Sequence, residues 1–261
     1  MSEKEIKEVE KIAALPKEEE PVISIKGLIK SYGPKVVING LDLKVKKGEL
    51  FGFIGKNGIG KSTTIDCLIG AKRFNSGEIL IEGKDIKKEP IEAKRCFGYV
   101  ASEPTCYEVM TGYEYLDFVA SVYGLSEEEL EKNTKYLANR LSLADSDLKE
   151  QISTYSHGMK QKICLIASLL HTPDVWILDE PTVGLDVMAV EALKTMMREY
   201  VDNGHTVLLT SHNIDLVAKL CDRVGIINNG HITKLLNLKE NPNLRLQLPI
   251  IFIQEYQEKA R

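Results

Sequence analysis

The chain has 261 residues, of which 43% are hydrophobic and 28% are charged, and its formal net charge is −4 at neutral pH. This length and composition are typical of a globular domain with a substantial hydrophobic core. The mildly acidic balance argues against a basic nucleic-acid-binding face. No apolar run approaches the roughly 18 residues that a membrane-spanning helix needs.

Residues 1–20 form a charged lead-in without an apolar core segment, which argues against a secretory signal. The chain contains no C-x-x-C pair, and its cysteines are scattered. We therefore expect reduced, buried thiols in a cytosolic protein, at Cys67, Cys96, Cys106, Cys164 and Cys221.

From residue 21 onward, short apolar segments alternate with segments of helical periodicity. The pattern predicts strands that begin near 22–25 and recur at 41–45, 50–54, 77–82, 97–101, 175–178, 206–210 and 224–227. It predicts helices at 62–70, 159–171, 189–203 and 214–221. Strands that alternate with helices indicate a mainly parallel sheet covered on both faces.

A helical insert is expected between residues 111 and 140. Apolar side chains recur there at helical spacing from Tyr115 to Tyr123, and Ser126 followed by Glu129 forms a capping-box pattern. This block therefore predicts two or three helices inside the α/β pattern.

The segment from Gly55 to Ser62 matches G-x-x-x-x-G-K-[ST]. Its glycines let successive backbone N–H groups turn toward phosphate oxygens, and the following helix presents its positive end to the same anion. Lys61 would place a charge on the β- and γ-phosphates, and Ser62 would offer a hydroxyl to Mg²⁺. By average composition, a chain of this length shows the pattern by chance on the order of 1% of the time. A chance match that also stands between a predicted strand and a predicted helix is rarer still.

A second constellation follows the apolar strand at 175–178, where Asp179 and Glu180 stand in succession. An acid at the end of a sheet strand lies at the ligand edge of an α/β fold. Asp179 could hold Mg²⁺ opposite Ser62, and Glu180 could accept a proton from a water that attacks the γ-phosphate. By themselves these acids would more simply end a strand in solvent. Together with the glycine loop they indicate one active site.

His212 follows the strand at 206–210. A lone histidine is more often structural, but one at the end of a neighbouring strand can reach a γ-phosphate.

These motifs resemble the ATP-binding subunit of an ABC transporter over about residues 21–235. The stretch Tyr155–Gln161 resembles the LSGGQ signature, Gly184–Asp186 resembles the D-loop, and Ser211–His212 resembles the switch histidine. The chain has no N-K-x-D motif, which disfavours a GTPase. The resemblance implies an α/β, RecA-like P-loop NTPase fold. Its parts would be a mainly parallel core, an antiparallel β subdomain and a helical subdomain at about 103–170, with a short C-terminal tail at 236–261.

The resemblance also implies a site for ATP and Mg²⁺. It implies catalytic roles for Lys61, Glu180 and His212, and metal contacts for Ser62, Asp179 and Ser102. Nucleotide-binding positions would be Tyr32, which stacks on adenine, and Gly55, Asn57, Gly58, Gly60, Lys61, Ser62, Thr63, Ser156, Gly158 and Asp186.

Several positions depart from the family pattern. Ser102 stands where a glutamine is usual, followed by Glu103, and His157 and Met159 alter the signature. Lys56 and Ile59 are also unusual in the phosphate loop, and we expect them to contribute only backbone.

Partners follow from the resemblance as well. A second phosphate-binding element in one chain suggests that two chains share each ATP, in a homodimer or heterodimer. A separate transmembrane permease would be required, and the protein would be cytoplasmic and peripheral on the inner face of the membrane. The segments at 103–125 and 248–261 resemble the corresponding parts of ATP-binding subunits of bacterial multi-component exporters.

Docking to the permease is expected on the helical insert, through Tyr107, Tyr113, Tyr115 and Phe118, although Tyr115 and Phe118 fit the insert's own core better. The competing interpretations are a soluble ABC-type ATPase that acts on ribosomes or DNA, and a binding module without catalysis. The single domain and the intact motif residues argue against both.

Overall fold

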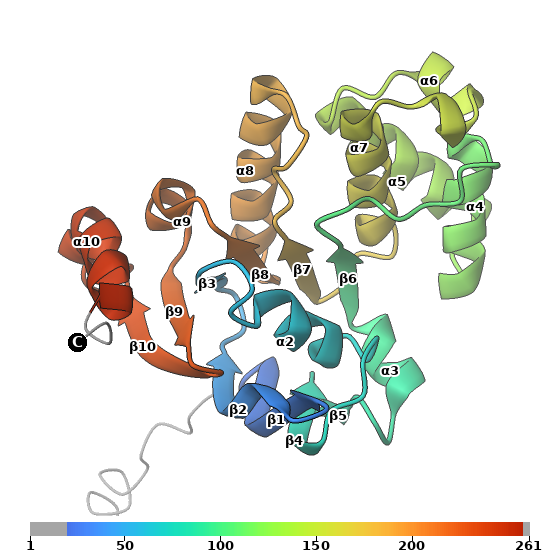
Figure 1. Ribbon diagram of the computed structural model, residues 1–261. Helices are drawn as coiled ribbons and strands as arrows, with labels where there is room; N and C mark the ends of the chain where they lie inside the picture. The colour runs from blue at the N-terminus through green and yellow to red at the C-terminus, as the bar shows by residue number, and fades with distance from the viewer. Residues whose placement is uncertain (1–19, 258–261) are drawn as a thin grey trace, which may run out of the picture.

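Two β-sheets form the centre of the computed structural model, which describes residues 20–257 of the chain. The predicted lead-in at 1–20 therefore lies, apart from residue 20, outside the described residues. Figure 1 shows the smaller sheet below, the larger sheet in the middle and a group of helices above it. Within the described part of the chain, none of the helices combines the length and the apolar character needed to cross a bilayer.

The smaller sheet is antiparallel and has the strand order β2-β1-β4-β5. Its strands are β1 (Ile23–Tyr32), β2 (Lys35–Val45), β4 (Ser76–Ile81) and β5 (Lys84–Asp85). Along β2, at the strand predicted for 41–45, Leu41, Leu43 and Val45 are buried while their neighbours Asp42 and Lys44 are exposed. This is the antiparallel β subdomain that the family resemblance implied.

The larger sheet has the order β10-β9-β3-β8-β7-β6, and every pairing is parallel except that of β10 with β9. The strands are β3 (Leu50–Ile54), β6 (Phe97–Val100), β7 (Val175–Asp179), β8 (Thr206–Ser211), β9 (Arg223–Asn228) and β10 (His231–Asn237). Asn229 and Gly230, both at positive φ, make the turn between β9 and β10. The mainly parallel core is therefore confirmed.

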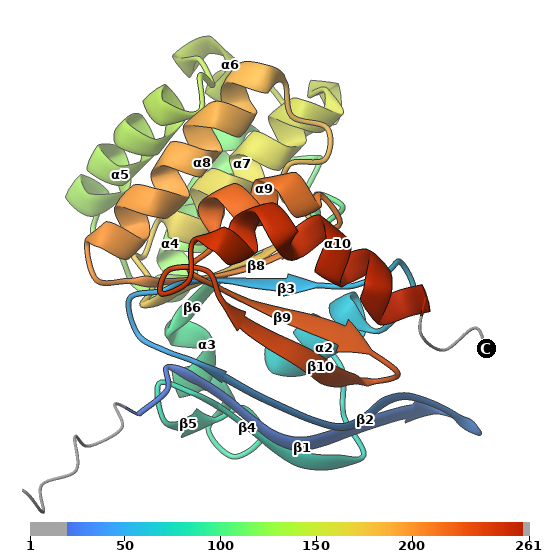
Figure 2. The same cartoon turned by 90° about the vertical axis from the view of Figure 1, so that its left-hand side faces the viewer.

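Helices cover both faces of this larger sheet. They are α2 (Lys61–Leu68), α3 (Pro90–Arg95), α7 (His157–Leu169), α8 (Val187–Asp202), α9 (Ile214–Leu220) and α10 (Asn243–Gln257). Figure 2 shows α8, α9 and α10 on one side of the sheet, while the antiparallel sheet lies on the other side. The C-terminal residues beyond β10 thus include a helix that packs against the core, through the buried Leu248.

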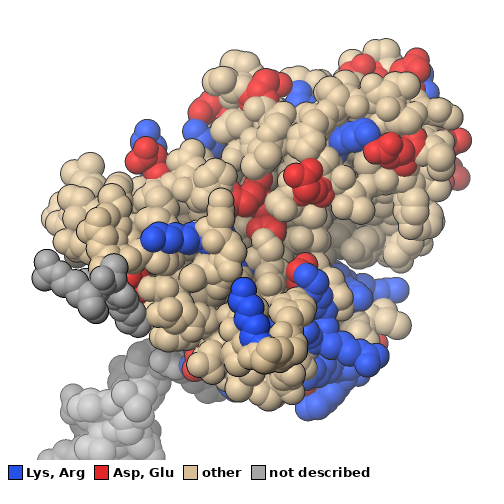
Figure 3. All heavy atoms as spheres, in the orientation of Figure 1, with Lys and Arg blue, Asp and Glu red and all other residues tan. Residues whose placement is uncertain are grey.

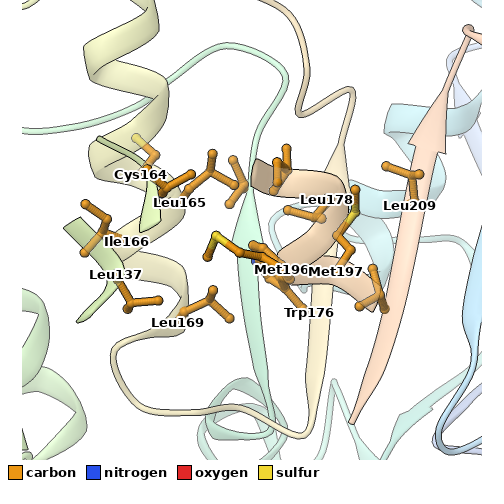
Figure 4. Packing of buried hydrophobic residues seen from close by; sticks show 14 of the residues in the cluster. Leu137, Cys164, Leu165, Ile166, Leu169, Trp176, Leu178, Met196, Met197 and Leu209 are labelled. Atoms are coloured by element: carbon orange, nitrogen blue, oxygen red, sulfur yellow. The ribbon is translucent and has the colours of Figure 1, made fainter. Parts of the chain in front are cut away.

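The core forms two clusters, one on each face of the larger sheet. Alternate residues of each strand enter different clusters, so that Phe51 and Phe53 pack toward the antiparallel sheet while Leu50 and Ile54 face the helices. Figure 4 shows the helix-side cluster, in which Trp176 of β7 meets side chains from α7 and α8. This packing fixes the parallel strands whose ends carry the motif residues.

The insert predicted at 111–140 contains α4 (Gly112–Tyr123) and α5 (Glu127–Arg140), and α6 (Asp145–Lys149) follows directly after it. The capping box predicted at Ser126 and Glu129 is present at the start of α5. Tyr115 is half-buried against the core as expected, but Phe118 is 40% exposed, so its assignment to the insert's core was wrong. Phe118 instead lies edge-on to the exposed Tyr107, with ring centroids 5.4 Å apart.

The cysteines behave largely as expected. All five are free, and Cys67, Cys96, Cys164 and Cys221 are buried, whereas Cys106 is half-buried. Burial raises the pKa of the Cys164 thiol to about 12, which keeps it protonated and unreactive at neutral pH.

His171 provides a test of packing between the insert and the core. Its ring stacks on Tyr123 with centroids 3.6 Å apart, and its Nε2 lies 3.3 Å from the carbonyl oxygen of Phe97. Burial lowers the pKa of His171 to about 4, and its Nδ1 atom has no hydrogen-bond partner in the described structure. The folded state therefore resists protonation of this ring.

An unfolded histidine has a pKa of about 6.5, so the unfolded chain binds the proton more readily than the folded chain. The stability due to a neutral His171 is complete above pH about 6.5 and is lost as the pH falls toward about 4. We expect His171→Phe, which keeps the stacking, to reduce the drop in unfolding free energy between pH 7 and 4.5 by about 2 kcal/mol. Urea unfolding at both pH values measures this, and an unchanged drop would contradict the assignment.

Candidate functional site

The phosphate loop connects the end of β3 to the start of α2. Gly58 and Gly60 adopt φ values of 75° and 121°, which side-chain-bearing residues avoid. Gly55 is needed for another reason, because a Cβ atom there would lie 2.6 Å from the side chain of Ile227 and 2.8 Å from that of Ile59. The loop is thus folded tightly against β9 and turns its backbone toward the start of α2.

Lys61 is the first residue of α2 and is only 6% exposed. Its ammonium donates hydrogen bonds to the carbonyl oxygens of Gly55, at 2.8 Å, and Lys56, at 3.3 Å. Burial lowers the pKa of Lys61, while the charges of Glu180 and Asp179 oppose that shift. The structure therefore brings the lysine of the first motif and the two acids of the second into one electrostatic site, as the sequence predicted.

The first turn of α2 presents the remaining loop residues. Ser62 is exposed and Thr63 is half-buried, and Asn57 and Gly58 lie exposed in the loop before the helix. Backbone N–H groups at a helix N-terminus point outward without intrahelical partners and favour an anion. The loop and the helix together can therefore hold a phosphate group.

Asp179 ends β7 and is 2% exposed. Its Oδ1 atom accepts a hydrogen bond from the hydroxyl of Thr210, the partner of Asp179 in the neighbouring strand β8. The same hydroxyl and the Thr210 carbonyl oxygen also accept the backbone N–H of Glu180, at 3.1 and 3.2 Å. Thr210 thus orients both acids, and no sequence motif marked it, since a threonine inside a buried strand carries no signal of its own.

Glu180 and His212 form a pair across the ends of two strands. Glu180 Oε2 lies 2.8 Å from His212 Nδ1 and 3.2 Å from the His212 backbone nitrogen, which donates to it. The Glu180 side chain is 13% exposed and the His212 side chain 61% exposed. Glu180 also has a φ of 49°, a strained conformation for a residue other than glycine. A carboxylate held in this way, with a histidine open to solvent, fits a proton acceptor with an orienting partner.

The donor atoms available for a metal fit Mg²⁺. Ser62 and Asp179 offer a hydroxyl and a carboxylate, both oxygen ligands, and Mg²⁺ typically takes one or two protein oxygens together with phosphates and water. No group of three or more His, Cys, Asp or Glu residues that could hold a metal occurs within residues 20–257. Ser102 lies half-buried in the loop after β6, next to β7 in the sheet, and its metal contact stays a prediction.

The signature segment begins α7. The Ser156 side chain caps the helix by accepting the backbone N–H of Met159 at 3.2 Å, and Ser156 is exposed. Gly158 lies against the D-loop, since a Cβ atom there would approach the carbonyl oxygen of Gly184 to 2.7 Å. Asp186 caps α8 and pairs with Lys162 of α7 at 3.4 Å. The signature and the D-loop are therefore neighbours within one chain.

Tyr32 ends β1 and is 44% exposed. The ammonium groups of Lys30 and Lys72 lie 4.5 and 6.0 Å from the centroid of its ring. Figure 3 shows that Lys and Arg side chains gather over the lower part of the molecule, where Figure 1 places the antiparallel sheet, α2 and α3. A positive surface of this kind favours the approach of a polyanion.

The side chains of Lys56 and Ile59, the two unusual residues of the phosphate loop, both make tertiary contacts. Ile59 is half-buried and packs against the core cluster below the larger sheet. The ammonium of Lys56 lies 4.5 Å from the centroid of the Tyr256 ring. Both side chains therefore have partners that are distant in sequence, while the expectation that these residues offer the nucleotide only backbone groups stays a prediction.

The fold and the site define a P-loop ATPase with an antiparallel β subdomain and a helical insert. Comparison with known proteins places the chain more closely. Residues 38–183, more than half of the chain, match the family model described as ABC transporter. The chain belongs to this family, and the predicted resemblance and ATPase class are confirmed.

Three curated relatives illustrate the relationship. The linearmycin resistance ATP-binding protein of Bacillus subtilis is 37% identical over 81% of this chain and 68% of its own length. A lantibiotic transport ATP-binding protein of Streptococcus pyogenes is 32% identical over 81% of this chain and 89% of its own. The daunorubicin/doxorubicin resistance ATP-binding protein of Streptomyces peucetius is 34% identical over 80% of this chain and 63% of its own.

Solved structures agree with this placement. An ATP-binding subunit of an ABC transporter superposes with a TM-score of 0.83 at 32% identity, over 90% of this chain and 98% of its own. A dimeric ATP-binding cassette bound to ADP and phosphate superposes with a TM-score of 0.75 over 83% of this chain and 98% of its own. Its identity of 20% means that it supports the fold alone.

Lys61 supplies the first test of the site. Lys61→Ala removes the buried ammonium whose charge Asp179 and Glu180 stabilise, and we expect ATP hydrolysis to fall at least about 100-fold. Phosphate release by the purified protein with Mg²⁺ measures the effect. The exposed Lys35→Ala is the matched control and should hydrolyse ATP at the wild-type rate. Hydrolysis that survives Lys61→Ala would contradict the site.

Proposed function

We propose that this chain is the ATP-hydrolysing subunit of an ABC exporter and drives a separate membrane permease by ATP-dependent dimerisation. The observation that supports the proposal is that one chain carries two helix starts suited to phosphate, after the glycine loop at Lys61 and at the Ser156 cap of α7. No hydrogen bond or ion pair between residues 20 and 257 joins the signature segment 155–161 to the phosphate loop. A facing copy of the chain, or a related subunit, would supply the signature to each ATP.

The surface near the D-loop supports a dimer. Val187 and Met188 are 77% and 78% exposed, directly after Asp186, and Val183 before it is also exposed. Exposed apolar side chains beside exposed binding residues are typical of a surface that a partner covers. In the dimer, Ser156, Gly158 and Asp186 would close on the nucleotide held by the other chain.

The proposed chemistry assigns a task to each residue at the strand ends. Glu180 accepts the proton of the attacking water, and His212 holds the Glu180 carboxylate in place and contacts the γ-phosphate. Lys61 neutralises charge on the β- and γ-phosphates. Ser62 and Asp179 would hold Mg²⁺, with Ser102 nearby, and the ion would stabilise charge on the phosphate oxygens. Tyr32, Gly55, Asn57, Gly58, Gly60 and Thr63 would complete the nucleotide contacts.

The same proposal divides the chain by task. Residues 21–235 would form most of the ATPase domain, with the helical subdomain at about 103–170, whereas α10 in the predicted tail at 236–261 packs onto that domain through Leu248. The exposed Tyr107, Val109, Phe118 and Val122 would dock to the permease at the inner face of the membrane. Export is favoured because the relatives are named for linearmycin or daunorubicin/doxorubicin resistance and for lantibiotic transport.

Glu180→Gln tests the dimer. The amide cannot accept the proton of the attacking water, so hydrolysis should fall by about 100-fold or more while ATP binding is retained. We expect the variant to accumulate as a dimer in Mg²⁺ and ATP, measured by size-exclusion chromatography with light scattering. The matched control Glu180→Gln/Lys61→Ala should stay monomeric. A Glu180→Gln protein that binds ATP but remains monomeric would contradict the proposal.

The docking surface has its own test. Phe118→Ser removes an exposed aromatic ring that contacts Tyr107, and we expect co-purification of the permease from membranes to fall about tenfold. Nucleotide binding by the isolated subunit should not change. Ile91→Ser, which alters a 66% exposed residue on α3, serves as the control. Equal recovery of the permease with both variants would exclude this surface.

A further inference from the structure

The C-terminal helix α10 contacts the phosphate loop through the side chain of Tyr256. The backbone N–H of Lys56 donates to the Tyr256 hydroxyl at 3.3 Å, and that hydroxyl donates to the carbonyl oxygen of Ile227 at 2.5 Å. One hydroxyl therefore uses its acceptor and its donor to tie the loop to the end of β9. Figure 2 shows α10 running across β9 toward the end of β3, where the loop begins.

The Tyr256 ring adds a second contact with the same residue. The ammonium of Lys56 lies 4.5 Å from the ring centroid, a geometry that favours a cation–π interaction. Burial raises the pKa of Tyr256, so its phenol remains protonated at neutral pH and keeps its donor for Ile227. Both the backbone and the side chain of Lys56 thus have a partner on α10.

The contacts continue from Lys56 to the site itself. The carbonyl oxygen of Lys56 accepts a hydrogen bond from the Lys61 ammonium at 3.3 Å. The preceding residue, Gly55, packs so closely against Ile227 that a Cβ atom would lie 2.6 Å from the Ile227 side chain. Tyr256 therefore links the start of the phosphate loop, at Lys56, to the end of β9, at Ile227.

Helix α10 is itself well anchored where it meets the core. Asn228 Nδ2 donates to the backbone carbonyl of Glu255 at 3.1 Å, and Lys234 lies 3.8 Å from the Glu255 carboxylate. At the other end of the helix, Arg245 donates to the carbonyl oxygen of Ala218 in α9 at 2.6 Å. The hydroxyl of Tyr256 is thus held in a fixed place relative to β9.

We propose that Tyr256 is a positioning residue for nucleotide binding. Through Lys56 it holds the start of the phosphate loop in place, and this raises the affinity of the site for the triphosphate. The proposal rests on the proposed function. Backbone N–H groups bind phosphate well only when they are oriented before the ligand arrives. A loop without this tether would have to be ordered at the moment of binding, which weakens affinity without altering the groups that carry out hydrolysis.

The test compares full-length wild type with Tyr256→Phe, which keeps the ring and loses only the hydroxyl. Calorimetric titration with ATP and Mg²⁺ should give a dissociation constant about three- to tenfold higher, the effect of one lost hydrogen bond of ordinary strength. In steady-state hydrolysis KM should rise by a similar factor while kcat changes less than twofold. Without nucleotide, amide hydrogen exchange should become faster in the peptide that contains Lys56.

Tyr136→Phe is the matched control, because Tyr136 is 57% exposed on α5 and its hydroxyl contacts only Arg140 there. It should leave the dissociation constant and the exchange at Lys56 unchanged. If Tyr256→Phe binds ATP like the wild type, or lowers only the melting temperature, the positioning role is overturned while the proposed function stands. If the wild type itself fails to bind ATP, the proposed function fails first.

Discussion

The buried ammonium of Lys61, held by two backbone carbonyls and stabilised by the charges of two carboxylates, is the interaction on which the rest of the site depends. Burial of a charge is costly unless partners compensate, and here Asp179, Glu180 and two backbone carbonyls do so. The parallel pairing of β3, β8 and β7 makes this possible. Ile54 lies opposite Ser211, and Thr210 lies opposite Asp179, so the ends of three strands meet at one edge of the sheet.

The site contains a strained backbone at Glu180 and buried polar side chains at Asp179 and Thr210, and the hydrophobic core must offset their free-energy cost. Glu180 adopts a left-handed backbone conformation, which costs about 1–3 kcal/mol in residues other than glycine. Thr210 compensates by accepting the Glu180 N–H and donating to Asp179 from within a fully buried strand. The packed clusters on both faces of the sheet hold these groups in place, because a core at close-packed density yields little to local strain.

Two sets of contacts flank this site, one at the signature and the D-loop and the other at α10. On one flank, the signature and the D-loop are packed together through Gly158 and Gly184. On the opposite flank of the phosphate loop, α10 reaches Lys56 from the C-terminal end of the described chain. Helix α10 therefore contacts the nucleotide site from outside its motifs.

The sequence by itself determined the α/β class, most strand and helix positions, and the residues of the phosphate loop and the acidic strand end. These follow from local spacing, because a glycine loop between a strand and a helix is encoded within about ten residues. The tertiary structure alone decided that Thr210 orients both acids, that Phe118 faces outward, and that Lys56 pairs with Tyr256. Lys56 and Tyr256 stand 200 positions apart, and the contact forms only because α10 packs across β9. No periodicity or motif encodes such a contact, since it depends on where two distant segments meet in space.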